Sequence, residues 1–345
     1  MKPATSQRSV QDANMTGGEQ SLNLKIFEAC DTPAPAFAAA LLGDFGARVT
    51  VIESAEGSGL RRLGSKQVQE VWWPIIGRNK RSLVLDDADP DRSQALRAIN
   101  PRLVMASISG FGQTGPHASR PGFGKIAEAM SGIVMLTGSP DEVPIHIGFS
   151  LADTSAGLMA AFGLALGLYQ RDVGGEQGSH ADVALFEPLF RMTECQLALT
   201  ERMGRAPLRE GSNDPYGWGA SGEAGVNPDA LRAVRCTDGH WLMLRASAPD
   251  EIVGRAEALP IGEALALLAR EEVAAAQVHD GATINASAYF RARGDVREVN
   301  DPVIGPVCVS GEIPKAWAEP DLPLFRPTRP DADRGRVLGP EQGEG

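Results

Sequence analysis

The chain has 345 residues, a formal net charge of −11 and a hydrophobic fraction of 43%. Its length predicts about two domains of ~150 residues, and an acidic chain without a cluster of Lys and Arg is a poor nucleic-acid binder. No apolar run reaches the ~18 residues of a membrane span. Four cysteines and five histidines are scattered along the chain, so we expect no metal site and a reducing, cytoplasmic compartment.

Residues 24–109 alternate strand-like and helix-like segments. Residues 1–23 are polar and predict a disordered leader. Apolar, β-rich runs predict four strands, at residues 24–27, 46–53, 82–86 and 103–109. This alternation is typical of an α/β fold with a Rossmann-like parallel sheet. No G-x-G-x-x-G follows the first strand, which argues against a nicotinamide-dependent dehydrogenase.

The rest of the chain predicts more helices and then a second domain. Three helices are expected at residues 124–136, 154–170 and 182–203. Residues 204–228 are rich in Gly, Asn, Pro and Asp and mark a boundary, and a hairpin at 233–245, a helix at 261–275 and strands within 296–311 follow. We therefore predict a large α/β domain of residues 24–205 and 298–345 and a smaller α+β domain of residues 206–297. The Pro- and Arg-rich tail is expected to be extended.

One carboxylate stands out between residues 107 and 157, where strand ends and glycine turns gather. The segment GFSLADTSAGLMAA places Asp153 directly before a predicted helix of small residues. Taken alone, Asp153 would be interpreted as a helix N-cap, since a carboxylate oxygen accepts backbone N–H bonds there. Ser107 and Ser109 lack the G-x-S-x-G context of a serine hydrolase, and we interpret His146 and His180 as ordinary histidines.

Three motifs in this region resemble the central signature of the family III CoA-transferases, which include formyl-CoA transferases, carnitine-type CoA transferases and α-methylacyl-CoA racemases. They are SISGFGQTGP, RPGFGKIAEAMSGIVMLTG and GFSLADTSAGLMAAFGLALGLYQR. GARVTVIE and RNKRSLVLD are similar to the N-terminal strands of the family, and ADVALFEPL is similar to the segment that follows its core motif. The resemblance extends over about residues 24–314 and implies an interlocked dimer.

The family's A-D-x-x-x-G motif falls on Ala152, Asp153 and Gly157. The resemblance therefore implies that Asp153 is the nucleophile that attacks an acyl-CoA thioester. Such an attack gives a mixed anhydride and then an enzyme-bound CoA thioester, from which CoA passes to a free carboxylic acid. The implied substrates are an acyl-CoA and a carboxylic acid, with no permanently bound cofactor.

The residues that the resemblance implies for binding CoA match the family less closely. They are Arg61, Arg62, Phe123, Lys125, Gly217, Gly219 and Gly222. The two arginines are chosen because Ser54 stands where the family has a basic residue. The glycines are chosen by composition, and a flexible surface connection is the alternative for them. Trp72 and Trp73 either stack an adenine or form a buried aromatic pair.

Two departures from the family pattern leave other functions open. Phe123 stands where the racemases have a histidine, and because phenylalanine cannot move a proton, a racemase is disfavoured. Residues 86–98 replace a longer family segment and are too few for a β-α-β crossover, so one sheet strand and part of the CoA-binding wall are predicted to be missing. The favoured function is acyl-CoA transfer by a homodimer. The alternative is a non-catalytic or partner-dependent subunit of a heteromer.

Overall fold

A computed structural model describes residues 24–85, 93–209, 211, 231–301, 304–315 and 329–338. The chain divides into two compact units. The first comprises Met1–Gly122, Ala152–Leu185 and Gly294–Gly345, and the second comprises Phe123–Leu151 and Phe186–Arg293. The predicted leader at residues 1–23 lies outside the described residues. The chain has an α/β fold with parallel strands, as expected.

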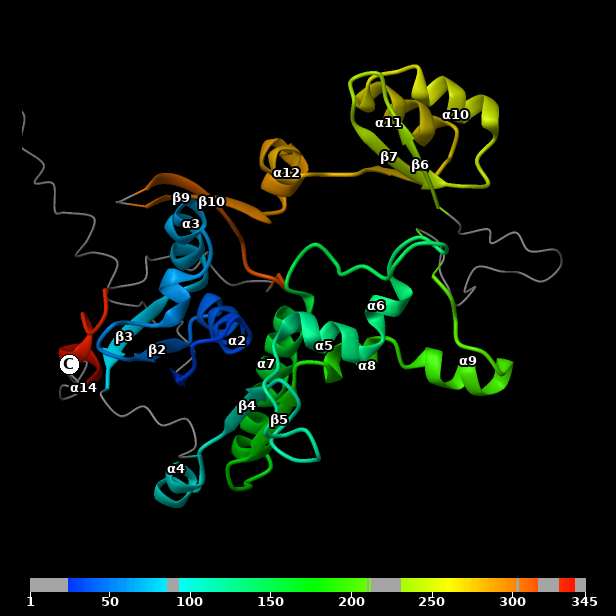
Figure 1. Ribbon diagram of the computed structural model, residues 1–345. Helices are drawn as coiled ribbons and strands as arrows, with labels where there is room; N and C mark the ends of the chain where they lie inside the picture. The colour runs from blue at the N-terminus through cyan, green and yellow to red at the C-terminus, as the bar shows by residue number, and fades with distance from the viewer. Residues whose placement is uncertain are drawn as a thin grey trace, which may run out of the picture. The chain divides into compact units, whose positions relative to one another are not determined.

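Three of the expected strands form a parallel sheet in the first unit. They are β1 (Lys25–Glu28), β2 (Arg48–Glu53) and β3 (Lys80–Val84), in the order β1-β2-β3 (Figure 1). Helix α2 (Pro33–Asp44) connects β1 to β2. The short helix η1 (Gly59–Arg62) and helix α3 (Lys66–Ile76) connect β2 to β3. A helical crossover between parallel neighbours is the usual connection, because parallel strands cannot be joined by a tight turn.

Small side chains allow α2 to lie close against its surroundings. Ala36 and Ala40 pack with Leu60 and Ile76 in one buried cluster, and Ala39 joins Ala47 and Val49 in another. The helix begins with Pro33, whose ring suits the first turn because no N–H partner is needed there. The start of α2 is therefore held firmly next to the carboxyl end of β1.

The fourth strand begins a separate parallel pair. It is β4 (Met105–Ser109), and its neighbour is β5 (His180–Ala184). Among the described strands, β4 is hydrogen-bonded to β5 alone, so the parallel strands form two sheets and not one continuous sheet. Helix α4 (Ser93–Ile99) precedes β4, within the segment predicted to be too short for a further strand and crossover.

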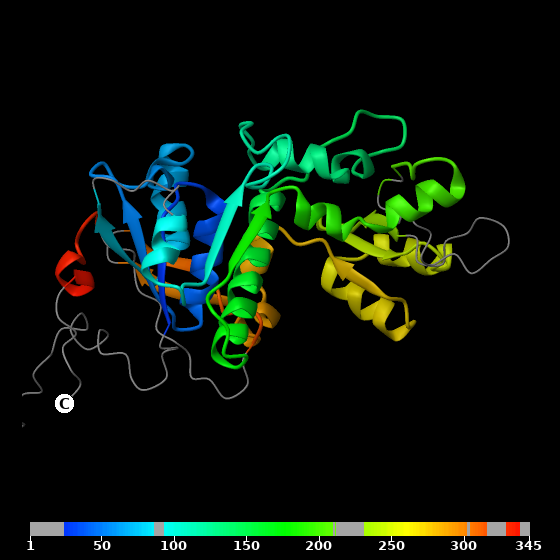
Figure 2. The ribbon, with the colours of Figure 1, turned by 90° about the horizontal axis from the view of Figure 1, so that it is seen from below.

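Helix α7 (Leu151–Asp172) lies beside β4 and β5 (Figures 1 and 2). It begins three residues before the start that was predicted at Thr154. A Cβ on Gly163 would lie 3.1 Å from the Cβ of Ala181, and one on Gly167 would lie 2.3 Å from Ser179 Oγ. These glycines therefore lie where the helix approaches β5 and the residue before it.

Helix α7 is long and apolar enough to cross a membrane, and it is the one such helix in the described part of the chain. The expectation that no segment reaches this length was therefore wrong. The reason is that its glycines interrupt the apolar run without interrupting the helix. One helix of this length and composition is weak evidence for a membrane segment, because the core helix of a soluble protein can be equally long and apolar.

Two helices predicted in the second unit are divided in the structure. The segment predicted at residues 124–136 forms α5 (Gly124–Ser131) and α6 (Ile133–Leu136), because Gly132 between them has φ 92°, which ends a right-handed helix. The helix predicted at residues 182–203 was wrong at its start. Residues 182–184 belong to β5, where they pair with β4, and only then follow α8 (Glu187–Met192) and α9 (Cys195–Met203).

The second unit also contains a small antiparallel sheet. Its strands are β6 (Leu231–Arg235), β7 (Trp241–Arg245) and β8 (Ala275–Gln277), in that order. Helices α10 (Asp250–Glu257) and α11 (Ile261–Arg270) share a core with it, which includes Leu242, Leu244, Val253 and Leu268. The predicted helix at 261–275 ends early because Glu272 takes a left-handed conformation, with φ 56°, before β8 begins.

Helices α12 (Gly281–Ala286) and α13 (Ala288–Ala292) lead to an antiparallel hairpin, β9 (Val296–Asp301) and β10 (Gly305–Ser310), as expected from the sequence. Part of the predicted extended tail, residues 329–338, is ordered and ends in α14 (Arg334–Leu338). There Asp333 Oδ2 accepts a hydrogen bond from Ser82 N at 3.0 Å, and Asp331 Oδ1 accepts one from Val84 N at 2.9 Å. The tail therefore covers backbone donors of β3.

Candidate active site

Asp153 lies in the first turn of α7, as its third residue, and is half-buried. The interpretation of Asp153 as an N-cap was therefore wrong, because the helix begins two residues before it. The first turn of a helix presents N–H groups without intrahelical partners and the positive end of the helix dipole. This position suits a side chain that acts as a nucleophile through a carboxylate oxygen.

Gly157 explains the spacing of the A-D-x-x-x-G motif in physical terms. A Cβ at this position would lie 2.7 Å from the carbonyl oxygen of Ala34 and 3.2 Å from Ala38 N, both in α2. On the same side of α7, Ala152, Ala156 and Ala160 are buried. Since Asp153 precedes Gly157 by four residues, it lies one turn away on the helix face that approaches the start of α2.

A buried ion pair lies beneath α2. Lys80 Nζ donates to Glu28 Oε2 at 2.8 Å and to the carbonyl oxygen of Ala36 at 2.7 Å, and both charged side chains are almost completely buried. Burial raises the pKa of Glu28 and lowers the pKa of Lys80. Because Lys80 contacts both β1 and α2, we interpret this pair as a structural connection and not as a substrate-binding group.

Arg61, one of the two arginines predicted to bind CoA, makes a bidentate contact with a carboxylate of the protein. Its Nε and Nη2 atoms lie 2.6 and 2.7 Å from the two oxygens of Glu53, and its guanidinium lies 4.2 Å from the ring centre of Trp73. Burial alone would raise the pKa of Glu53, but hydrogen bonds from Arg61, Ser82 and the backbone of Ser58 lower it. The guanidinium group of Arg61 is therefore oriented toward the carboxylate of Glu53.

Arg62, the second arginine, is the last residue of η1 and is exposed. Its Nη1 donates to the carbonyl oxygen of Glu56 at 2.9 Å. Trp72 and Trp73 pack against the cluster of α2, η1 and α3, and their indole nitrogens are buried. Both side chains are half-buried against this cluster, and the ring of Trp73 lies under the guanidinium of Arg61.

Phe123 and Lys125 lie at the start of α5 in the second unit. Phe123 is the residue before the helix and its side chain is 63% exposed. Lys125 Nζ lies 3.0 Å from each carboxylate oxygen of Glu128, whose side chain is fully buried. His146 Nδ1 lies 2.9 Å from the same carboxylate. Sequence reasoning missed Glu128, although its spacing of three residues from Lys125 on a helix predicts a contact.

The remaining glycines predicted to bind CoA, Gly217, Gly219 and Gly222, lie outside the described residues. In the ranges that the structure does describe, no three His, Cys, Asp or Glu side chains are grouped so that they could hold a metal ion. His180, which was interpreted as ordinary, lies with its Nε2 2.7 Å from Ser107 Oγ on β4. The nearby carboxylate of Asp182 accepts a hydrogen bond from Gln113 N.

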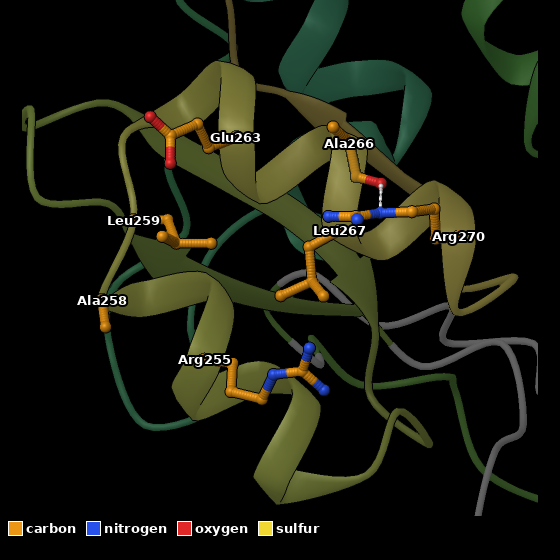
Figure 3. A pocket seen from close by; sticks show the side chains of 7 residues that line it. All are labelled: Arg255, Ala258, Leu259, Glu263, Ala266, Leu267 and Arg270. Atoms are coloured by element: carbon orange, nitrogen blue, oxygen red, sulfur yellow. Dashed lines mark hydrogen bonds between the residues drawn. The ribbon is translucent and has the colours of Figure 1, made fainter.

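A shallow pocket of about 470 Å³ lies between α10 and α11 in the second unit (Figure 3). Its lining consists of Arg255, Ala258, Leu259, Glu263, Ala266, Leu267 and Arg270. Arg270 Nε donates to the carbonyl oxygen of Ala266 at 3.2 Å, and Arg255 pairs with Glu271. None of the residues predicted from the sequence to bind CoA or to react lies in this pocket, so we place the candidate site around Asp153.

Comparison with known proteins shows the family to which the chain belongs. The family model "CoA-transferase family III" matches residues 23–95 and 92–263. The chain is 30% identical, over 269 residues, to a succinyl-CoA–D-citramalate CoA-transferase of Chloroflexus aurantiacus, which covers 69% of this chain and 64% of the relative. It is 34% identical, over 204 residues, to the beta subunit of a succinyl-CoA–L-malate CoA-transferase of the same organism, covering 50% of each.

The fold is likewise similar to a solved structure. A CAIB/BAIF family protein from Brucella suis superimposes with a TM-score of 0.73 and 24% identity, covering 91% of this chain and 97% of that one. The chain belongs to CoA-transferase family III, as the motifs indicated. It spans between half and two thirds of the length of the two transferase relatives.

Proposed function

We propose that the protein is an acyl-CoA transferase and that Asp153 carries the acyl group and CoA in turn. The observation that supports this most strongly is the place of Asp153: a half-buried carboxylate in the first turn of α7, seated by Gly157 against α2. Membership of family III supports the same reaction class, since the similar relatives are named as CoA-transferases.

The reaction consists of balanced exchanges. A carboxylate oxygen of Asp153 attacks the thioester carbonyl, the C–S bond breaks, and CoA leaves as a thiolate, giving a mixed anhydride. The thiolate then attacks the aspartyl carbonyl, which releases the donor acid and leaves an aspartyl-CoA thioester. An acceptor carboxylate displaces CoA in the reverse sequence. Each step exchanges bonds of similar energy, so no ATP is required.

The test is CoA exchange between a panel of acyl-CoA donors and free carboxylic acids, with Asp153→Asn beside the wild type. The amide keeps the shape and much of the capping capacity of the side chain but is not a nucleophile. We expect the variant to fold with unchanged circular dichroism and to lose exchange by at least ~10³-fold. Intact-mass analysis should show an acyl or CoA adduct on the wild type and none on the variant. Unchanged exchange in Asp153→Asn would refute the assignment.

For CoA recognition we propose Arg62 as a contact to phosphate. It is exposed at the end of η1, in the connection that follows β2, and the carboxyl ends of parallel strands are where ligands gather in such folds. The guanidinium of Arg61 is directed to Glu53 and supports this loop. For Gly217, Gly219 and Gly222 we keep the proposal that a glycine-rich loop supplies N–H donors to the developing oxyanion.

We further propose that two copies of the chain associate through α7. Four of its apolar side chains, Leu158, Phe162, Leu166 and Tyr169, are 46–65% exposed and lie on one face by their spacing. A face of this kind is unfavourable in water and favours association. A second copy fits the homodimer that the sequence implied.

A partner-dependent subunit is the second candidate function. Two observations favour it: the chain is similar to the beta subunit of a succinyl-CoA–L-malate CoA-transferase, and it spans half to two thirds of the length of the two transferase relatives. Exchange that requires a second, different protein would support this candidate, whereas exchange by the chain alone would exclude it. The racemase alternative is disfavoured because Phe123, at the entry to α5, has no proton to transfer.

A further inference from the structure

The side chain of Glu128 is fully buried and has two polar partners. Its side chain has an exposed fraction of 0%, and Lys125 Nζ lies 3.0 Å from both carboxylate oxygens. His146 Nδ1 lies 2.9 Å from Oε2. A buried carboxylate without such partners is strongly destabilising, so Glu128 holds the ammonium group of Lys125 in one place.

From that place Lys125 reaches the backbone of a distant segment. Its Nζ donates to the carbonyl oxygens of Ile147, at 2.8 Å, and Phe149, at 2.9 Å. The carbonyl oxygen of Phe149 also accepts a hydrogen bond from Leu151 N at 2.9 Å. Leu151 is the first residue of α7, and Asp153 is two residues further. A continuous series of hydrogen bonds thus leads from Glu128 to the start of the helix that carries Asp153.

The same contacts argue against a role for Lys125 in holding a phosphate group. An ammonium group has three N–H donors, and here four acceptor atoms surround it. Binding a phosphate would require Lys125 to give up at least one of these four acceptors.

We propose that Lys125 is a positioning residue: held by Glu128, it fixes residues 147–149 and thereby the first turn of α7. This inference rests on the proposed role of Asp153 as the nucleophile. A displacement of a reacting group by about 1 Å can cost ~10²-fold in rate. Loss of Lys125 is therefore expected to lower the rate of the chemical step and to leave CoA binding unaffected.

The decisive experiment compares Lys125→Met, Lys125→Arg and the control Lys66→Met, which removes an exposed lysine at the start of α3. We expect Lys125→Met to lower kcat for CoA exchange about 10- to 100-fold with KM for the acyl-CoA within about twofold of wild type. Lys125→Arg, which keeps the charge, should recover part of kcat. A higher KM with unchanged kcat would overturn the proposal and would return Lys125 to the role of a CoA ligand.

Amide hydrogen exchange gives a second readout that does not depend on activity. Lys125→Met should raise the exchange of amides 147–153 at least ~10-fold and leave β6 and β7 unchanged, whereas Lys66→Met should alter neither. Unchanged protection of residues 147–153 would overturn the proposal even if the wild-type chain is inactive alone. If Asp153→Asn still transfers CoA, the proposed nucleophile is refuted. The amide hydrogen exchange of residues 147–153 would still decide the role of Lys125.

Discussion

Gly157→Ala tests the contact that seats Asp153. The new methyl carbon would be placed 2.7 Å from the carbonyl oxygen of Ala34, 3.0 Å from Phe37 and 3.2 Å from the backbone nitrogen of Ala38. Two of these three atoms are main chain and cannot rotate away. Replacing Gly by Ala inside a helix gains about 1 kcal/mol, and overpacking costs about 1–3 kcal/mol. Because the atoms that the methyl group meets are mostly main chain, we take the upper part of the overpacking cost. We therefore expect a net loss of about 1–2 kcal/mol in the free energy of unfolding.

Gly254→Ala is the matched control. Gly254 lies inside α10, and a Cβ there would meet nothing within 4 Å. The same substitution should therefore stabilise the protein by about 0.5–1 kcal/mol, because only the helix-propensity gain remains.

Both variants should be unfolded with urea and followed by circular dichroism, with CoA exchange measured on the folded protein. The two substitutions should shift the unfolding midpoint in opposite directions, and Gly157→Ala should also lower exchange because it moves the first turn of α7. An equal stabilisation by both substitutions would refute the close approach of α7 to α2. The spacing of the A-D-x-x-x-G motif would then need a different explanation.

Two further predictions concern the support of the site and its assembly. Glu53→Gln keeps the shape of the side chain but leaves Arg61 without its charged partner, and we expect a loss of about 3 kcal/mol at pH 7, measured by urea unfolding. The pKa of Glu53 is lowered in the folded state, so its contribution to stability is complete above the ordinary Glu pKa of about 4.3 and is lost as the pH falls through the lowered value. The difference in free energy of unfolding between wild type and variant should therefore shrink below that pH. A difference that stays constant with pH would contradict this prediction. Phe162→Asp on the exposed face of α7 should raise the dimer dissociation constant, measured by light scattering, about 10- to 100-fold, because the burial of one aromatic side chain is lost. An unchanged dissociation constant would exclude this face from the interface.

The sequence was most informative where a local pattern alone determines the element. The strands β1 to β4 were predicted because each is a short apolar run between turn signals, and packing on a parallel sheet requires such runs. The hairpin of β6 and β7 and that of β9 and β10 were recognised for the same reason. Family membership came from motifs whose spacing the structure explains, as at Gly157.

Other features depend on contacts that a sequence does not display. β5 was mistaken for the start of a helix because its strand character comes from pairing with β4, seventy-five residues earlier. The two parallel sheets could not be separated in advance, since which strands pair is decided by long-range packing. Arg61 was proposed as a CoA contact because Ser54 stands where the family has a basic residue, and only the structure places Glu53 beside Arg61.

The tail of the chain has a consequence for how the protein is made. The backbone donors of Ser82 and Val84 are matched by the carboxylates of Asp333 and Asp331, about 250 residues later in the sequence. A ribosome produces β3 long before those carboxylates exist, so the nascent sheet has an open edge during most of synthesis, available for pairing with any exposed strand. Residues 331–333 thus complete the hydrogen bonding of the first sheet, and truncation before them is expected to reduce soluble yield.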